Sequence, residues 1–245
     1  MAGEFPATFA TNPVQKLGNM QLNINLPDAP TTSEGAYTVE FSAGKSIALP
    51  LIGQVGQIKK MGFKEDAAMG STSAKCNMTK DYSVEDVYVL DWKADKVYYT
   101  RLGNLAKYFA TARVNGCGVI IGGDRKSPTI VHANISPDSV YPENGAAYTA
   151  WSEAEDKGAH QTQLSTREKH DAWNRYYNNL AMTLRKDNKI SNDTISVVDP
   201  RIYQADGSYG RIFGVRADNG DWTFYLNRDK GTQQAITQEI WPKMF

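Results

Sequence analysis

Residues 115–134 have the sequence NGCGVIIGGDRKSPTIVHAN, in which two short apolar runs flank a polar segment. Both runs are rich in β-branched residues, which favour extended backbone. The segment Gly122–Pro128 between them combines glycine, aspartate and proline, the residue types that dominate turns. The stretch therefore predicts a β-hairpin with strands at Gly118–Ile121 and Thr129–Ile135.

The register of this hairpin decides which side chains meet. Pairing Ile121 with Pro128 places Cys117 directly opposite His132. The Cβ atoms of directly opposed residues lie about 5 Å apart on one face, so the thiol would contact the imidazole. A slip of one residue would turn one of the two side chains to the other face. We therefore predict a Cys117–His132 pair.

A cysteine–histidine pair is suited to acyl transfer from an amide. A free thiol has a pKa near about 8.5, and a histidine in contact lowers that pKa by stabilising the thiolate. The thiolate attacks the amide carbon, and nearby backbone N–H groups hold the oxyanion. Gly116 and Gly118 leave the backbone bare on both sides of Cys117, so we interpret them as oxyanion or substrate contacts.

The pair does not identify the substrate. Attack on a side-chain amide gives deamidation, an incoming amine gives transamidation, and attack on a backbone amide gives proteolysis. A non-enzymatic β-rich binding module is also open, because cysteine is among the residue types most often buried merely for packing. Rapid alkylation of Cys117 would favour the enzyme, and an inert or bridged thiol would favour the module.

Composition restricts the class of protein. The chain has 245 residues, of which 41% are apolar and 22% charged, as is ordinary for a globular protein. The 27 basic side chains balance 27 acidic ones, so no net field steers the chain to nucleic acid or to an anionic membrane. No apolar run approaches the roughly 20 residues that span a bilayer. We expect a monomer with no nucleic-acid or membrane partner.

Neither a metal nor a cofactor is expected. The histidines and cysteines lack the spacing of a zinc site, and Gly44-Lys45-Ser46 lacks the first glycine of a phosphate-binding loop. Two cysteines are too few for a disulfide scaffold, so free thiols are expected, with a single Cys76–Cys117 bridge as the alternative.

The rest of the chain is mostly β in pattern. A capping box at Ser165-Thr166-Arg167-Glu168 predicts one helix, with apolar residues at helical spacing up to Leu184. Leu105–Val114 fits either a helix or a strand, and we interpret Lys64–Asp81 and Tyr141–Lys157 as surface loops that could contact a target. Further strands are expected at Met20–Leu26, Tyr37–Phe41, Ser46–Leu51, Gln57–Met61, Asp86–Lys93, Lys96–Leu102, Thr194–Gln204, Tyr209–Arg216 and Trp222–Leu226.

These segments predict an α+β fold, with a mostly antiparallel β-sandwich or sheet core, flanking helices and long loops. We expect Asp86–Lys93 to pair with Lys96–Leu102, and the last three strands to form a meander. The domain prediction is a poorly ordered N-terminal segment over residues 1–35, followed by a single catalytic domain over residues 36–245.

The hairpin resembles the glutamine deamidase toxin family, which includes the cytotoxic necrotizing factors and the Burkholderia lethal factor. Those proteins carry a Leu-Ser-Gly-Cys motif, a glycine-rich loop and a histidine on the next strand. Val114-Asn115-Gly116-Cys117, the loop 122–124 and Ile130-Val131-His132 stand in those places. In the lethal factor the backbone carbonyl of a threonine orients the histidine, and Thr111 matches its position.

The resemblance implies a β-sandwich fold and a cysteine-dependent deamidase with Cys117, His132 and Thr111 in the catalytic site. Asn115 replaces the family's serine and is a candidate substrate or oxyanion contact. Such proteins are virulence effectors that deamidate a Rho-type GTPase or a translation-initiation RNA helicase. By resemblance we expect a toxin that is secreted by a non-classical or specialised route and acts in the host cytosol.

Overall fold

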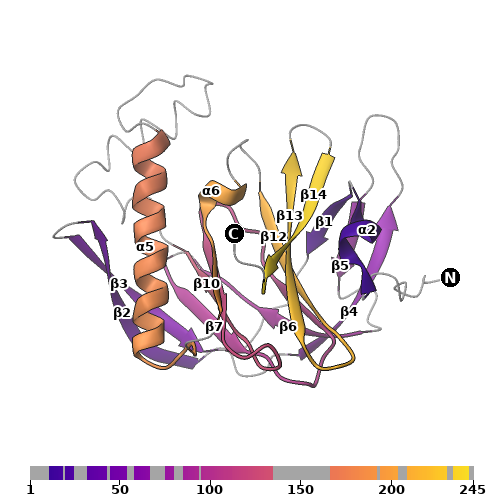
Figure 1. Ribbon diagram of the computed structural model, residues 1–245, viewed down its shortest axis with the longest axis horizontal. Coiled ribbons are helices and arrows are strands. Elements are labelled where there is room, and N and C mark those ends of the chain that lie inside the picture. Colours follow the sequence, from indigo (N-terminus) through magenta and orange to yellow (C-terminus); the bar gives the residue numbers. More distant parts are fainter. Residues whose placement is uncertain are drawn as a thin grey trace.

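The chain folds as an α+β protein in which two β-sheets are stacked and one long helix covers the outer face of the smaller sheet (Figure 1). No helix in the part of the chain that is described is long and apolar enough to cross a membrane. The computed structural model describes residues 11–18, 20–24, 32–42, 45–53, 58–66, 75–79, 85–93, 95–134, 166–191, 194–203, 209–230 and 234–242.

The larger sheet has eight strands, and its edges come together. The order is β1 (Gln21–Ile24), β5 (Lys75–Thr79), β4 (Ile58–Asp66), β6 (Glu85–Leu90), β8 (Tyr108–Thr111), β12 (Gly210–Arg216), β13 (Trp222–Lys230) and β14 (Gln234–Trp241). Asn227 on β13 links the two edges, because its side chain bonds the Leu22 N–H of β1 and the Thr237 hydroxyl of β14. The sheet therefore curls.

The smaller sheet has six strands and carries the central hairpin. Its order is β11 (Ile195–Val198), β9 (Gly118–Gly122), β10 (Thr129–Ala133), β7 (Val97–Arg101), β3 (Lys45–Gly53) and β2 (Thr32–Ser42). Every residue of β9 and β10 is buried. The hairpin is thus covered on both faces.

Strand alternation separates the apolar layers. On β6, Tyr88 and Leu90 face the core between the sheets, whereas Val87 and Val89 face the other side, where Leu17 and Leu22 cover them. Trp222 and Trp241, the largest side chains with no exposed surface, lie in the core between the sheets.

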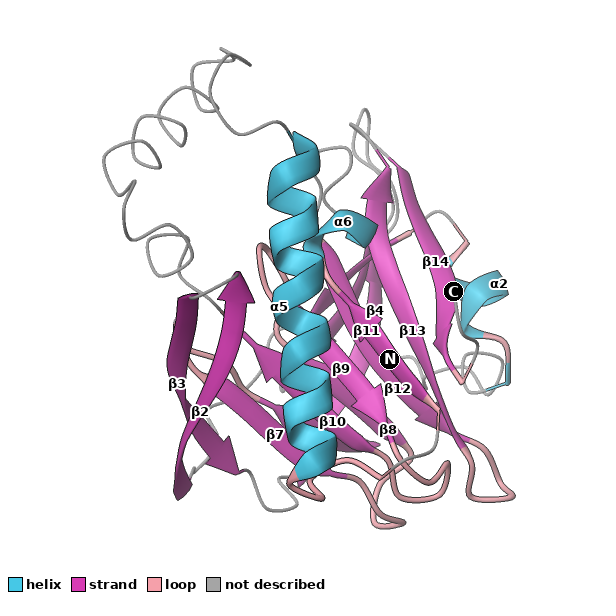
Figure 2. Cartoon of the chain, turned by 60° about the vertical axis from the view of Figure 1, so that its left-hand side comes forward, coloured by secondary structure: helices cyan, strands magenta, loops and turns pink. Residues whose placement is uncertain are grey.

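Helix α5 (Thr166–Lys186) lies across the outer face of the smaller sheet (Figure 2). Tyr176, Tyr177, Leu180 and Leu184 follow the helical period and are fully buried against Ile120 and its neighbours. The predicted helix is confirmed over this range, and its expected cap at Ser165 lies outside the described residues. Two short helices, α2 (Pro13–Leu17) and α6 (Pro200–Tyr203), complete the described elements.

The hairpin is confirmed, but its predicted register is wrong by two residues. Thr129 pairs with Gly122, and Ala133 pairs with Gly118. Pro128 has no N–H to donate, so the ladder begins at Thr129. Continued by one residue, this register sets Cys117 opposite Asn134.

Two predicted strand pairings are also wrong. β6 and β7 belong to different sheets, so the chain crosses between sheets at Asp95 instead of forming a hairpin. β11 likewise lies in the smaller sheet and β12 in the larger, so only the β12–β13 pair of the predicted meander is confirmed. Its third strand is β14, which was not predicted. In both cases alternation fixed each strand's faces but not its partner, which is set by burial between two sheets.

Two predicted irregular regions contain folded elements. Residues 13–24 hold α2 and β1, and β2 begins at Thr32, so the prediction of a poorly ordered segment over 1–35 is wrong for these residues. The predicted loop Lys64–Asp81 contains the end of β4 and all of β5. Leu105–Val114 resolves as the strand β8.

Candidate functional site

Cys117 immediately precedes β9, and two buried tyrosines fix its backbone. The Tyr177 hydroxyl of α5 donates to the Gly116 carbonyl at 3.0 Å, and the Tyr203 hydroxyl of α6 donates to the Cys117 carbonyl at 2.6 Å. Both tyrosines are fully buried. Because the carbonyl and N–H of a trans peptide point in opposite directions, the Cys117 N–H points away from Tyr177.

The glycines beside Cys117 have different roles. Gly116 has φ of +80°, a conformation that glycine adopts without strain, and a Cβ there would meet no atom within 4 Å. A Cβ on Gly118 would lie 2.3 Å from the Tyr177 ring. The expectation that Gly118 leaves room for a substrate is therefore wrong, because Tyr177 fills that space.

The Cys117 thiol is a free, nearly buried group with two polar neighbours. Its side chain is not in a disulfide, and the residue is 2% exposed. The Asn134 amide nitrogen donates to Sγ at 3.0 Å, and Sγ makes a weak contact of 4.0 Å to the Asn115 carbonyl. Burial raises the thiol pKa above its usual value, and these two contacts partly offset that effect. Because the Cys117 thiol is free, the alternative of a Cys76–Cys117 disulfide is excluded.

The expected lowering of the thiol pKa by a histidine contact is not found. Asn134, not His132, lies opposite Cys117, so His132 occupies the diagonal position on the same face. Diagonal neighbours have Cβ atoms roughly 7 Å apart. The error follows directly from the register at Pro128.

His132 makes one hydrogen bond, and that bond determines its tautomer. Its Nδ1 lies 2.7 Å from the Thr111 hydroxyl oxygen, and the same hydroxyl donates to the Leu90 carbonyl at 2.9 Å. The single hydroxyl hydrogen is given to the carbonyl, so Thr111 accepts a hydrogen from Nδ1. The imidazole is therefore protonated on Nδ1, and Nε2 carries a lone pair.

The His132 ring is a buried, neutral base. Nε2 is buried and has no hydrogen-bond partner among the residues that the structure describes. Burial lowers the His132 pKa to about 3, because a charged imidazolium is costly to hold away from water. Thr111 thus pairs with His132 as the resemblance implied, but through its side chain and not its backbone carbonyl.

A cavity of about 600 Å³ opens onto the thiol. Its lining includes Cys117 and the polar or aromatic side chains of Asp91, Trp92, Arg113, Asn115 and Asn134. Trp92 is 40% exposed, and its ring is nearly parallel to the His132 ring at 6.4 Å between centroids. His132 is not among the described residues that line the cavity. Trp92 both lines the cavity and lies beside the His132 ring.

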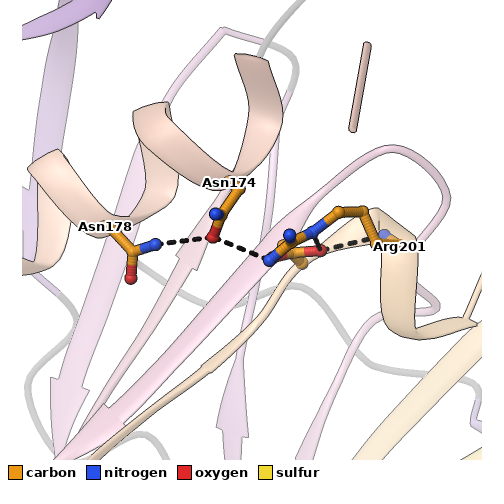
Figure 3. Close-up of polar contacts among 4 residues, drawn as sticks. Asn174, Asn178 and Arg201 are labelled. Atoms are coloured by element: carbon orange, nitrogen blue, oxygen red, sulfur yellow. Dashed lines mark hydrogen bonds and ion pairs between the residues drawn. The ribbon is translucent and has the colours of Figure 1, made fainter. Parts of the chain in front are cut away.

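A polar cluster ties α5 to α6 next to the tyrosines (Figure 3). The Arg201 side chain donates three hydrogen bonds to the Asp199 carboxylate, two from Nε and one from Nη2. The same Nη2 donates to the Asn174 carbonyl oxygen at 2.7 Å. Asn178 donates to that oxygen at 2.6 Å. Asp199 is 1% exposed, so the cluster fixes the two helices that hold the Cys117 loop.

The structure brings three of the six predicted site residues close together. Thr111 of β8 is bonded to His132 of β10, and Cys117 lies on the same face of the hairpin as His132. Asn115 lines the cavity, Gly116 provides the turn before the thiol, and Gly118 packs against α5.

Sequence reasoning missed Asn134 and the two tyrosines. Asn134 could have been found from its spacing, because it lies two residues after His132 and therefore on the same face of the strand. No local pattern points to Tyr177 or Tyr203, since their contacts with the loop span 61 and 86 residues of chain.

No group of three potential metal ligands occurs in the described ranges of the chain. Comparison of the sequence with protein-family models and with curated proteins found no match.

Proposed function

We propose that this protein is a cysteine-dependent amidohydrolase that deamidates a glutamine side chain. The hydrogen-bond chain from His132 through Thr111 to the Leu90 carbonyl carries the proposal. It supports a role for His132 as a base, because it presents an unprotonated Nε2 on the same face of the hairpin as a thiol that lines a cavity.

The proposed site works from a neutral thiol and a neutral imidazole. Burial raises the Cys117 pKa and lowers the His132 pKa, so a resting ion pair is unfavourable at neutral pH. His132 therefore acts as a general base during the attack, as histidine does with a serine nucleophile. In the structure Sγ contacts Asn134 and not the imidazole, so the proposal requires Cys117 to rotate about its Cα–Cβ bond toward Nε2 during the attack.

In the proposed reaction, the Cys117 thiol first attacks the side-chain amide of the substrate. The Cys117 proton passes to Nε2 while Sγ bonds to the amide carbon, and the carbonyl electron pair moves onto oxygen. The tetrahedral intermediate collapses, the C–N bond breaks, and Nε2 returns the proton to the leaving group, which departs as ammonia. Water then attacks the thioester and gives a proton to His132, the C–S bond breaks, and His132 returns that proton to sulfur. The carboxylic acid formed loses its proton to solvent.

The substrate assignment rests on the cavity and on the resemblance of the hairpin. A glutamine side chain is small enough to enter a cavity of about 600 Å³ and present a primary amide to Sγ. We propose that the natural target is a host protein, either a Rho-type GTPase or a translation-initiation RNA helicase. The protein would then be a toxin or effector that acts in the host cytosol.

The test uses a eukaryotic cell lysate and mass spectrometry of its peptides. The protein is expected to convert glutamine to glutamate at one site. The variant Cys117→Ser should abolish this conversion, and Cys76→Ser, which changes the other cysteine, should retain it. New chain termini that depend on Cys117 would make the protein a protease. No change that depends on Cys117, together with a thiol inert to alkylation, would leave a β-rich binding module.

A further inference from the structure

Asn134 directly contacts the sulfur atom that the proposed reaction uses. Its Nδ2 lies 3.0 Å from the Cys117 Sγ, and Asn134 directly follows the last residue of β10. Its backbone N–H donates to the Lys96 carbonyl of the neighbouring chain segment at 3.0 Å, which holds the asparagine in place. The contact is therefore made from a position next to β10 whose backbone is hydrogen-bonded to the neighbouring segment.

The Asn134 amide has spare hydrogen-bonding capacity toward the cavity. A carboxamide nitrogen carries two hydrogens, and the bond to Sγ uses one of them. No bond from the second hydrogen was found to any residue in the described part of the chain. Asn134 lines the cavity together with Cys117, so the second hydrogen is available to a bound group that lies against the sulfur.

We propose that Asn134 is a catalytic residue: one amide hydrogen stabilises the Cys117 thiolate, and the other donates to the amide oxygen of the substrate as it becomes an oxyanion. The oxyanion role rests on the proposed function, whereas the thiolate role does not. A charge-assisted hydrogen bond is stronger than a neutral one, so both bonds strengthen as the negative charge develops. The bond to sulfur offsets part of the effect of burial on the thiol pKa.

The first test measures the thiol alone. In a Cys76→Ser background, the rate of Cys117 alkylation by iodoacetamide is followed against pH. Asn134→Ala should move the midpoint of the profile upward by about one unit and slow alkylation at pH 7 about tenfold, because the thiolate loses a charge-assisted donor. Asn134→Asp should raise the midpoint further, since a carboxylate adds a like charge. A thermal melt of each variant shows that it is folded.

The second test measures turnover of the substrate glutamine found in the lysate experiment. Asn134→Ala should lower kcat about a hundredfold with little change in KM, as loss of an oxyanion donor does. An unchanged alkylation midpoint in folded Asn134→Ala overturns the thiolate role, and an unchanged kcat overturns the oxyanion role. If wild-type protein deamidates nothing but the midpoint still moves, the proposed function fails while the thiolate role stands.

Discussion

At the scale of single residues, the Thr111 hydroxyl determines the proton position on the proposed base. Thr111→Val keeps the shape of the side chain but leaves the Nδ1–H and the Leu90 carbonyl without a partner in a fully buried site. We expect a loss of about 1–3 kcal/mol of unfolding free energy from the unsatisfied groups.

The same variant should change the histidine tautomer. Nitrogen-15 spectra should show Nδ1 protonation in the wild type and a mixture of tautomers in Thr111→Val. Thr111→Ser, which keeps the hydroxyl, is the control and should resemble the wild type in both measurements. A wild type protonated on Nε2 would contradict the assignment.

Burial of His132 predicts a dependence of stability on pH. The folded-state pKa of about 3 lies below the usual value of 6.5, so between these values the unfolded state binds a proton that the folded state does not. Stability should therefore fall as pH decreases from about 6.5 toward 3, by at most about 1.4 kcal/mol per pH unit from this group.

Urea denaturation at several pH values measures this slope. Carboxylates also titrate in the window, so the comparison is with His132→Gln, which cannot titrate. The difference in unfolding free energy between the two proteins should shrink as pH falls. A constant difference would show that His132 has an ordinary pKa in the folded state.

At the scale of elements, the close approach of α5 to β9 depends on the absence of a side chain at Gly118. Gly118→Ala places a methyl group 2.3 Å from the Tyr177 ring, so either the helix or the strand must move. We expect a loss of about 1–3 kcal/mol by thermal or urea unfolding, as is typical of overpacked cores. In a Tyr177→Leu background the cost should be smaller, because the ring is gone. Equal costs in both backgrounds would show that the two residues are not coupled.

The cluster between α5 and α6 predicts a second effect at this scale. Arg201→Ala leaves the Asp199 carboxylate buried and without its guanidinium, and about 2 kcal/mol of unfolding free energy should be lost. The figure is below that of a fully buried pair because the arginine side chain is 34% exposed. Arg175→Ala, which removes an exposed arginine of α5, is the control and should cost little. Equal losses of unfolding free energy in the two variants would show that the cluster does not stabilise the packing of α5 on α6.

The sequence was sufficient to predict local elements but not the pairing of strands that are distant along the chain. Alternation and turn chemistry are local, and they were sufficient for the hairpin β9–β10, for helix α5 and for the Asn219-Gly220 turn, where Gly220 has φ of +91°. Which strands pair across the chain is set by burial between sheets. The pairing of β6 and β7 was predicted wrongly for that reason, since alternation does not distinguish two sheets that face each other.

In the candidate site, too, contacts within one hairpin could be predicted and contacts with distant elements could not. Cys117 and His132 could be placed on one face because they belong to one hairpin. The two-residue error in register nevertheless exchanged Asn134 for His132 as the direct neighbour of the sulfur. The Tyr203 contact was out of reach, because it depends on where a distant helix packs.

At the scale of the whole molecule, strand position should determine local stability. β8 and β10 lie inside their sheets with both faces buried, whereas β11 lies at an edge. We expect the amides of β8 and β10 to exchange with solvent at rates near those of global unfolding, and the outward amides of β11 to exchange faster. Native-state hydrogen exchange by mass spectrometry measures both. Equal protection of β11 and β10 would indicate that the smaller sheet opens only as one unit.

The Thr111–His132 bond joins β8 of one sheet to β10 of the other. The tautomer with its hydrogen on Nδ1 is therefore selected only while the two layers are in contact. A nascent chain, or one that has been extended for passage across a narrow opening, contains both residues but does not hold the proton on Nδ1. Under the proposed function, amide hydrolysis would then begin only with the final closure of the molecule, and a half-assembled chain would leave the glutamines around it intact.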